Sequence, residues 1–101
     1  MIIKRLLSKV TLYERKYCGL CEEAKKQIIL VGEQVHNLIN FIIEKIPFDL
    51  ECIDIDYKEN KRKYIKFTYD VPFIHINDNF AMQHRVDPSL LFQMIKNSDN
   101  E

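Results

Sequence analysis

Two cysteines separated by two residues are the feature of this sequence that could do chemistry. Cys18 and Cys21 follow the apolar residues 10–13 and a short polar segment. A strand that leads into such a pair, with a helix that begins at the pair, is typical of thiol–disulfide exchange. The attacking species in that chemistry is a thiolate, so one cysteine must be stabilised in its charged form. The other must resolve the mixed disulfide.

The spacing predicts different roles for the two thiols. Cys18 would lie at the N-terminus of the helix, where free backbone N–H groups and the helix dipole stabilise an anion by roughly 0.3–1 kcal/mol. Cys21 is almost one helical turn further on, so its sulfur can reach Cys18 while it stays less exposed. We therefore expect Cys18 to be the nucleophile and Cys21 the resolving thiol. Lys16 and Arg15 would strengthen the positive potential at Cys18. Glu22 and Glu23 would oppose it.

Two other interpretations of the cysteine pair stay open. Both residues could be small buried hydrophobic side chains, or they could form half of a structural zinc site. Zinc would need two more ligands, and the remaining candidates show no second paired spacing; they are His36, Cys52, His75 and His84. We therefore expect redox chemistry and no metal.

The remaining reactive side chains are assigned by their positions. Cys52 alternates with apolar residues in a strand-like segment, so we expect it to pack in the core, with a regulatory thiol as the alternative. His75 also occupies a strand position, where a lone histidine is more often structural than catalytic. His84 and Arg85 end the last strand-like segment, and their side chains either face the cysteines or face solvent.

Length, composition and charge describe an ordinary globular chain. With 101 residues, 47% of them hydrophobic and 30% charged, residues 1–101 should form a single domain with its own core. Lys plus Arg and Asp plus Glu number 15 each, so no overall field attracts nucleic acid or an anionic membrane. No apolar run reaches the roughly 18 residues of a membrane span.

The cysteine count bears on the compartment. Three cysteines, an odd number, argue against a secreted disulfide scaffold. Residues 1–9 lack the apolar stretch and the cleavage site of a secretory signal. We expect a cytoplasmic protein, with the mitochondrion as the alternative compartment.

The elements that must position the cysteines alternate between strands and helices. Short β-branched or alternating segments predict strands at residues 10–13, 48–56, 71–76 and 80–86, the last two joined by a tight turn. Charged residues 57–69 predict a short surface helix or turn-rich connection, and Asp87 followed by Pro88 predicts the start of a last helix. The order β-α-β-α-β-β-α predicts an α/β fold, a four-stranded mixed sheet flanked by helices.

The first helical region is extended. Its apolar residues recur at spacings of three and four; they are Cys21, Ala24, Ile28, Val31, Val35, Leu38 and Ile42. A helix over residues 19–44 would be roughly 39 Å long, about twice the length of a typical strand. Because glycine costs about 1 kcal/mol inside a helix, we expect a break or bend at Gly32. Otherwise residues 33–46 would expose an apolar surface for a partner or for self-association.

With these motifs in hand, the sequence resembles the glutaredoxins of the thioredoxin-fold superfamily over about residues 9–96. The resemblance is carried by residues 10–13 (VTLY), 18–24 (CGLCEEA), 54–56 (DID) and 70–73 (DVPF). It looks closest to the small glutaredoxin-like proteins with leucine before the second cysteine, whose hairpin ends like residues 82–86 (MQHRV).

The resemblance implies a second half of the site. Pro72 would be a cis-proline beside the cysteines, and the Val71 backbone would pair with an extended segment of the substrate. Further substrate-binding candidates stand before the cysteines and after the hairpin; they are Lys16, Tyr17, His84 and Arg85. Glutaredoxins carry a Gly-Gly pair in the region where this sequence has residues 80–85, FAMQHR. Glutathione binding is therefore a separate question from disulfide chemistry.

The sequence thus predicts a glutaredoxin-like thiol–disulfide oxidoreductase that acts on a disulfide-bearing protein or a glutathione mixed disulfide. No tightly bound cofactor is expected, and glutathione or a reductase would restore the dithiol. Two further hypotheses stay open. The chain could be a non-catalytic thioredoxin-fold module that binds a partner through its extra helical segment, or it could hold an iron–sulfur cluster between two chains through Cys18.

Overall fold

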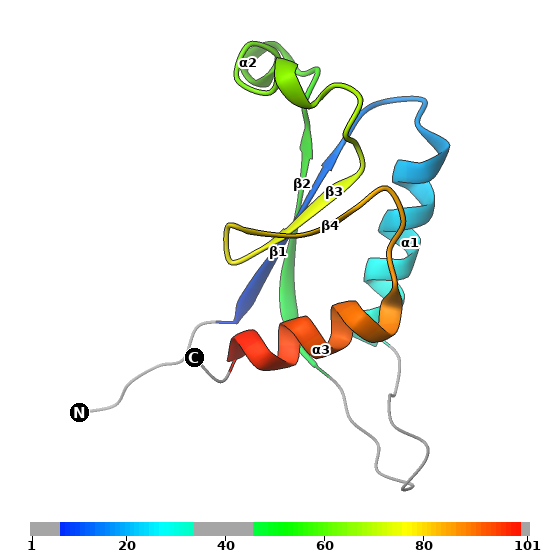
Figure 1. Cartoon of the computed structure of the whole chain (residues 1–101), viewed down its shortest axis with the longest axis vertical. Coiled ribbons are helices and arrows are strands. Elements are labelled where there is room, and N and C mark those ends of the chain that lie inside the picture. Colours follow the sequence, from blue (N-terminus) through cyan, green and yellow to red (C-terminus); the bar gives the residue numbers. More distant parts are fainter. Residues whose placement is uncertain (1–6, 34–45, 100–101) are drawn as a thin grey trace, which may run out of the picture.

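The computed structural model describes residues 7–33 and 46–99 (Figure 1). Its elements, in chain order, are β1 (Ser8–Glu14), α1 (Gly19–Glu33), β2 (Phe48–Asp54), α2 (Lys58–Lys61), the 3-10 helix η1 (Ile65–Phe67), β3 (Phe73–Ile76), β4 (Asn79–Gln83) and α3 (Pro88–Asp99). This order confirms the predicted alternation, with a 3-10 turn added between α2 and β3. None of the described helices is long and apolar enough to cross a membrane.

The strands form one mixed sheet in the order β2-β1-β3-β4. Strand β1 pairs in parallel with β2 and antiparallel with β3, and β3 pairs antiparallel with β4. Strand β1 therefore lies inside the sheet. Its residues 10–13 are buried because apolar side chains cover both faces of the sheet there. Its carboxyl end leads the chain directly to the cysteines.

Helices α1 and α3 cover the same face of the sheet (Figure 1). The apolar core between them and the sheet consists of Val10, Leu12, Ala24, Ile28, Val31, Ile46, Ile74, Ile76, Met82, Leu91, Phe92 and Ile95. The stripe predicted for α1 is confirmed as far as the helix is described, because its first four members are buried. The members from Val35 onward lie outside the described residues.

The opposite face of the sheet carries a smaller aromatic cluster. Tyr13 stacks on Phe73 with ring centroids 4.2 Å apart, and Tyr64 packs against this pair from the segment between α2 and η1. Ile55, directly after β2, is buried in the same cluster. These contacts hold the connections after β2 and before β3 against the carboxyl end of β1.

The start of α3 agrees with its sequence signal. The side-chain Oδ1 of Asp87 accepts a hydrogen bond from the Leu90 N–H at 3.2 Å, and the Asp87 carbonyl accepts one from the Leu91 N–H at 2.9 Å. Asp87 is therefore the N-cap and Pro88 the first helical residue, where a missing N–H does no harm.

The prediction that Cys52 packs in the core is wrong, because Cys52 is exposed. Cys52 does lie in a strand, and its partner in the register of β1 and β2 is the buried Leu12. However, β2 is the edge of the sheet. Alternation of apolar residues identifies one face of a strand, but it does not show whether a helix covers that face at the edge.

Gly32 belongs to α1, which runs through it to Glu33. A Cβ atom at this position would lie 3.1 Å from Cε1 of the Phe48 ring. The glycine therefore allows the helix to approach the first residue of β2 closely. The predicted break or overhang beyond it, and the predicted partner surface at residues 33–46, fall almost wholly outside the described residues.

Candidate functional site

Cys18 and Cys21 form a disulfide at the start of α1, with Cα atoms 5.2 Å apart. Cys18 is half-buried, whereas Cys21 is only 1% exposed. Cys21 lies in the apolar stripe of α1, so the helix that carries it also shields it. This matches the predicted difference in accessibility between an outer and an inner thiol.

Cys18 is the N-cap of α1. Its carbonyl accepts the Glu22 N–H at 3.1 Å, which is the first hydrogen bond of the helix. Its Sγ accepts the Cys21 N–H, also at 3.1 Å. The sulfur therefore occupies the place of a capping oxygen and faces the positive end of the helix. An N–H group in this position stabilises a sulfur that carries negative charge.

The peptide bond between Val71 and Pro72 is cis, as the resemblance implied. Pro72 is fully buried, and its carbonyl accepts the His84 N–H at 2.6 Å. His84 follows β4 with a positive φ of 67°. Its backbone therefore ties the end of the hairpin to the proline at the start of β3.

Four of the predicted substrate-binding residues line two cavities, whereas the two cysteines, Val71 and Pro72 line neither of them. His84 and Arg85 line a cavity of about 280 Å³ together with Leu20, the residue between Gly19 and Cys21. The sequence left open whether these two side chains face the cysteines or face solvent. In the structure both residues are exposed, and both border the helix that carries the cysteines.

The second cavity, of about 520 Å³, contains the other two candidates. Lys16 and Tyr17 line it with Glu22 of α1 and Asp54 of β2. Tyr17 directly precedes Cys18, is fully exposed and has a positive φ of 58°. Its ring therefore stands out into solvent beside the disulfide.

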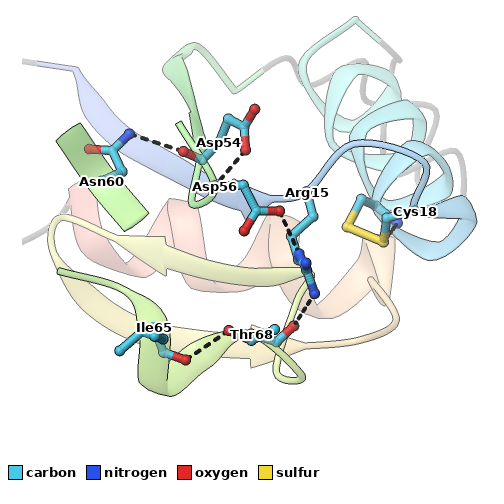
Figure 2. A network of polar contacts seen from close by, with 8 residues as sticks. Arg15, Cys18, Asp54, Asp56, Asn60, Ile65 and Thr68 are labelled. Carbon is cyan, nitrogen blue, oxygen red and sulfur yellow. Dashed lines mark hydrogen bonds and ion pairs between the residues drawn. A yellow bond between two sulfur atoms is a disulfide. The ribbon is translucent and has the colours of Figure 1, made fainter. Parts of the chain in front are cut away.

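Arg15 makes contacts that the sequence analysis did not predict (Figure 2). Its Nε donates to Oδ2 of Asp56 at 2.7 Å, and its Nη1 donates to the carbonyl oxygen of Thr68 at 3.3 Å. The Asp56 N–H in turn donates to Oδ1 of Asp54 at 2.9 Å. No spacing in the sequence reveals a contact between residues 41 positions apart. The one related signal is the DID segment at residues 54–56, which carries part of the family resemblance and contains Asp56.

The third cysteine differs from the pair in its surroundings. Although Cys52 is exposed, neighbouring atoms remove part of the water around its sulfur, and this raises the pKa of the thiol. Nearby Lys25 lowers the pKa, and Glu14 raises it. Lys25 and Glu14 also form an ion pair of 3.3 Å. A raised pKa keeps this thiol protonated and weakly nucleophilic. Among residues 7–33 and 46–99, no group of three or more His, Cys, Asp or Glu residues could hold a metal ion.

Comparisons with known proteins agree with this architecture. Residues 9–96 match the family described as Glutaredoxin-like domain (DUF836). The chain is 32% identical over 83 residues to the glutaredoxin-like protein YDR286C homolog of Dictyostelium discoideum, an alignment that covers 82% of this chain and 70% of that protein.

Two solved structures share the fold at low sequence identity. One is a thioredoxin-2, described as a component of malaria parasite protein secretion machinery, with a TM-score of 0.60, 16% identity and coverage of 96% of this chain and 88% of that one. The other is described as a malarial protein, with a TM-score of 0.58, 19% identity and coverage of 90% of this chain and 96% of that one.

Proposed function

The chain belongs to the glutaredoxin-like domain family, and on that premise we propose that it is a thiol–disulfide oxidoreductase. The observation that carries the proposal is the position of Cys18. Its sulfur accepts an N–H hydrogen bond at the start of α1 and is bonded to the shielded sulfur of Cys21. An outer sulfur stabilised as an anion and an inner sulfur within bonding distance are the two parts that disulfide exchange needs.

In the proposed reaction the reduced protein attacks with the Cys18 thiolate. A bond forms between Cys18 Sγ and one sulfur of the substrate disulfide, the substrate S–S bond breaks, and the leaving thiolate takes a proton from water. Cys21, deprotonated, then attacks Cys18 Sγ and releases the second substrate thiol. The substrate gains two electrons, and the protein ends with the Cys18–Cys21 disulfide. Two molecules of glutathione, or a dithiol reductase, supply two electrons to restore the dithiol.

The substrate-binding part of the proposal uses both sides of the disulfide. The Val71 backbone, before the cis-proline, would pair with an extended substrate segment. Lys16 and Tyr17 border the larger cavity, and His84 and Arg85 border the smaller one. A disulfide-bearing protein or a glutathione mixed disulfide would contact these residues as it presents its sulfur to Cys18.

The test is the catalysed reduction of a peptide–glutathione mixed disulfide with glutathione as the reductant. Wild-type protein should accelerate the reaction, and Cys18→Ser should abolish the acceleration. Cys52→Ser is the matched control, because it also removes one thiol but should leave the rate unchanged. An inactive wild type would contradict the proposal in favour of a non-catalytic module. Visible absorbance of anaerobically purified protein that is lost in Cys18→Ser would favour an iron–sulfur cluster instead.

A further inference from the structure

We propose that Arg15 is a positioning residue, which holds the substrate-binding backbone around Val71 at a fixed place relative to Cys18. The inference rests on the proposed function and adds a residue to it. Arg15 stands three residues before Cys18, in the loop between β1 and α1. Its own side chain points away from that loop and toward two other segments (Figure 2).

The guanidinium of Arg15 joins three loops at one end of the sheet. It starts from the loop after β1, contacts the Asp56 carboxylate in the turn after β2, and contacts the Thr68 carbonyl after η1. The chain then reaches Val71 three residues after Thr68. The two halves of the site, which are far apart in the sequence, are therefore connected through one side chain.

Both partners of Arg15 are themselves held in place. The Thr68 hydroxyl donates to the Ile65 carbonyl at 2.7 Å, and the Asp70 N–H donates to the Phe67 carbonyl at 2.9 Å, so the end of η1 is fixed. On the other side, the Asp56 N–H donates to the Asp54 carboxylate at 2.9 Å. A contact between two fixed segments transmits position, whereas a contact with a free side chain does not.

Arginine suits this place better than lysine does. Its planar guanidinium presents several N–H donors in a fixed fork, so it can bond a carboxylate and a carbonyl at the same time. The side chains of Arg15 and Asp56 are 35% and 37% exposed, which leaves the ion pair only partly screened by solvent. A lysine would keep the charge and one contact but would not bridge both groups.

The consequence depends on the size of the substrate. An extended peptide disulfide must pair with the Val71 backbone and reach Cys18 at the same time, so it requires a fixed separation between them. A small disulfide such as bis(hydroxyethyl) disulfide needs only the Cys18 sulfur. Loss of the Arg15 contacts should therefore weaken the use of peptide disulfides selectively.

The experiment compares kcat and KM for a synthetic peptide mixed disulfide and for bis(hydroxyethyl) disulfide. Arg15→Ala and Asp56→Asn should raise the KM for the peptide about tenfold, the effect of losing one hydrogen bond to a charged group, and should change the small-disulfide rate less than twofold. Arg15→Lys should fall between them and wild type. Lys9→Ala is the matched control, because it removes an exposed ion pair of 2.9 Å with Asp78 at the other end of the sheet.

A second readout does not depend on activity. The backbone amide NMR signals of residues 68–71 should shift in Arg15→Lys, a variant chosen because it keeps the charge and the stem of the side chain. They should not shift in Lys9→Ala. The inference is overturned if the peptide KM stays unchanged, if both substrates lose rate equally, or if the control behaves as the Arg15 variants do. A wild type that reduces neither disulfide would instead contradict the proposed function, and the positioning role with it.

Discussion

Replacing Cys18 by serine and by alanine separates its structural role from its chemical role. Cys18 caps α1 through its carbonyl and its sulfur, and the Cys21 N–H is 3.1 Å from that sulfur. Serine is a good N-cap residue and can accept the same N–H, whereas alanine cannot; loss of a cap costs about 0.5–2 kcal/mol. Neither variant can form the disulfide or attack one. The two variants should thus differ in stability but not in activity.

The magnitude depends on whether the wild type is oxidised. The disulfide closes only the loop 18–21, for which the chain-entropy relation gives about 2 kcal/mol of stabilisation. In reducing buffer the wild type has no disulfide, so this stabilisation does not add to the difference between the wild type and the variants. Cys18→Ser should then match the reduced wild type within about 0.5 kcal/mol. Cys18→Ala should be about 1 kcal/mol less stable, a fall of roughly 4–8 °C in Tm for a domain of this size.

The assay is urea unfolding followed by circular dichroism, with and without dithiothreitol, alongside the disulfide reduction assay. Oxidised wild type should exceed Cys18→Ser by about 2 kcal/mol. If Cys18→Ala proved as stable as Cys18→Ser in reducing buffer, Cys18 would not be the helix cap. If either variant retained catalysis, Cys18 would not be the nucleophile.

Three further predictions concern other described residues. Burial lowers the pKa of His75, although Asp78 acts in the opposite direction. The unfolded chain therefore binds a proton at this histidine more readily than the folded chain does. The free energy of unfolding should decrease as pH falls below about 6.5. His75→Gln should flatten this decrease in urea titrations at several pH values, and an equally steep decrease in that variant would contradict the prediction. The raised pKa of Cys52 should make it slower than Cys18 to react with iodoacetamide in the reduced protein at neutral pH, as peptide mapping would show; faster labelling of Cys52 would refute this. Asp87→Ala should cost about 1 kcal/mol of unfolding free energy through loss of the α3 cap, and Asp87→Ser should restore most of it.

Much of the fold was predictable because its signals are local. The stripe of Cys21, Ala24, Ile28 and Val31 marks one face of a helix, and the Asp87 cap marks the start of another. Residues 10–13 indicate a buried strand because they are β-branched, apolar or aromatic, and the structure buries all four. These signals depend on neighbours within one element, so periodicity and capping chemistry are enough to find them.

What the sequence could not show depends on the assembled sheet. Cys52 was placed in the core because its strand alternates, but the edge position of β2 follows from how the strands pair. The contact from Arg15 to Asp56 and Thr68 requires three loops to meet at one end of the sheet. The cysteines indicated the site directly from the sequence. The family resemblance added Val71 and Pro72, and it added the candidates Lys16, Tyr17, His84 and Arg85, which line the two cavities.

The most direct test of thiol–disulfide exchange is to trap its intermediate. In Cys21→Ser the resolving thiol is absent, so the mixed disulfide formed by Cys18 should persist. After incubation of the reduced variant with a peptide–glutathione mixed disulfide, mass spectrometry of the digested protein should find the adduct on Cys18. An unmodified Cys18, or an adduct found only on Cys52, would contradict the assignment of Cys18 as the attacking thiol.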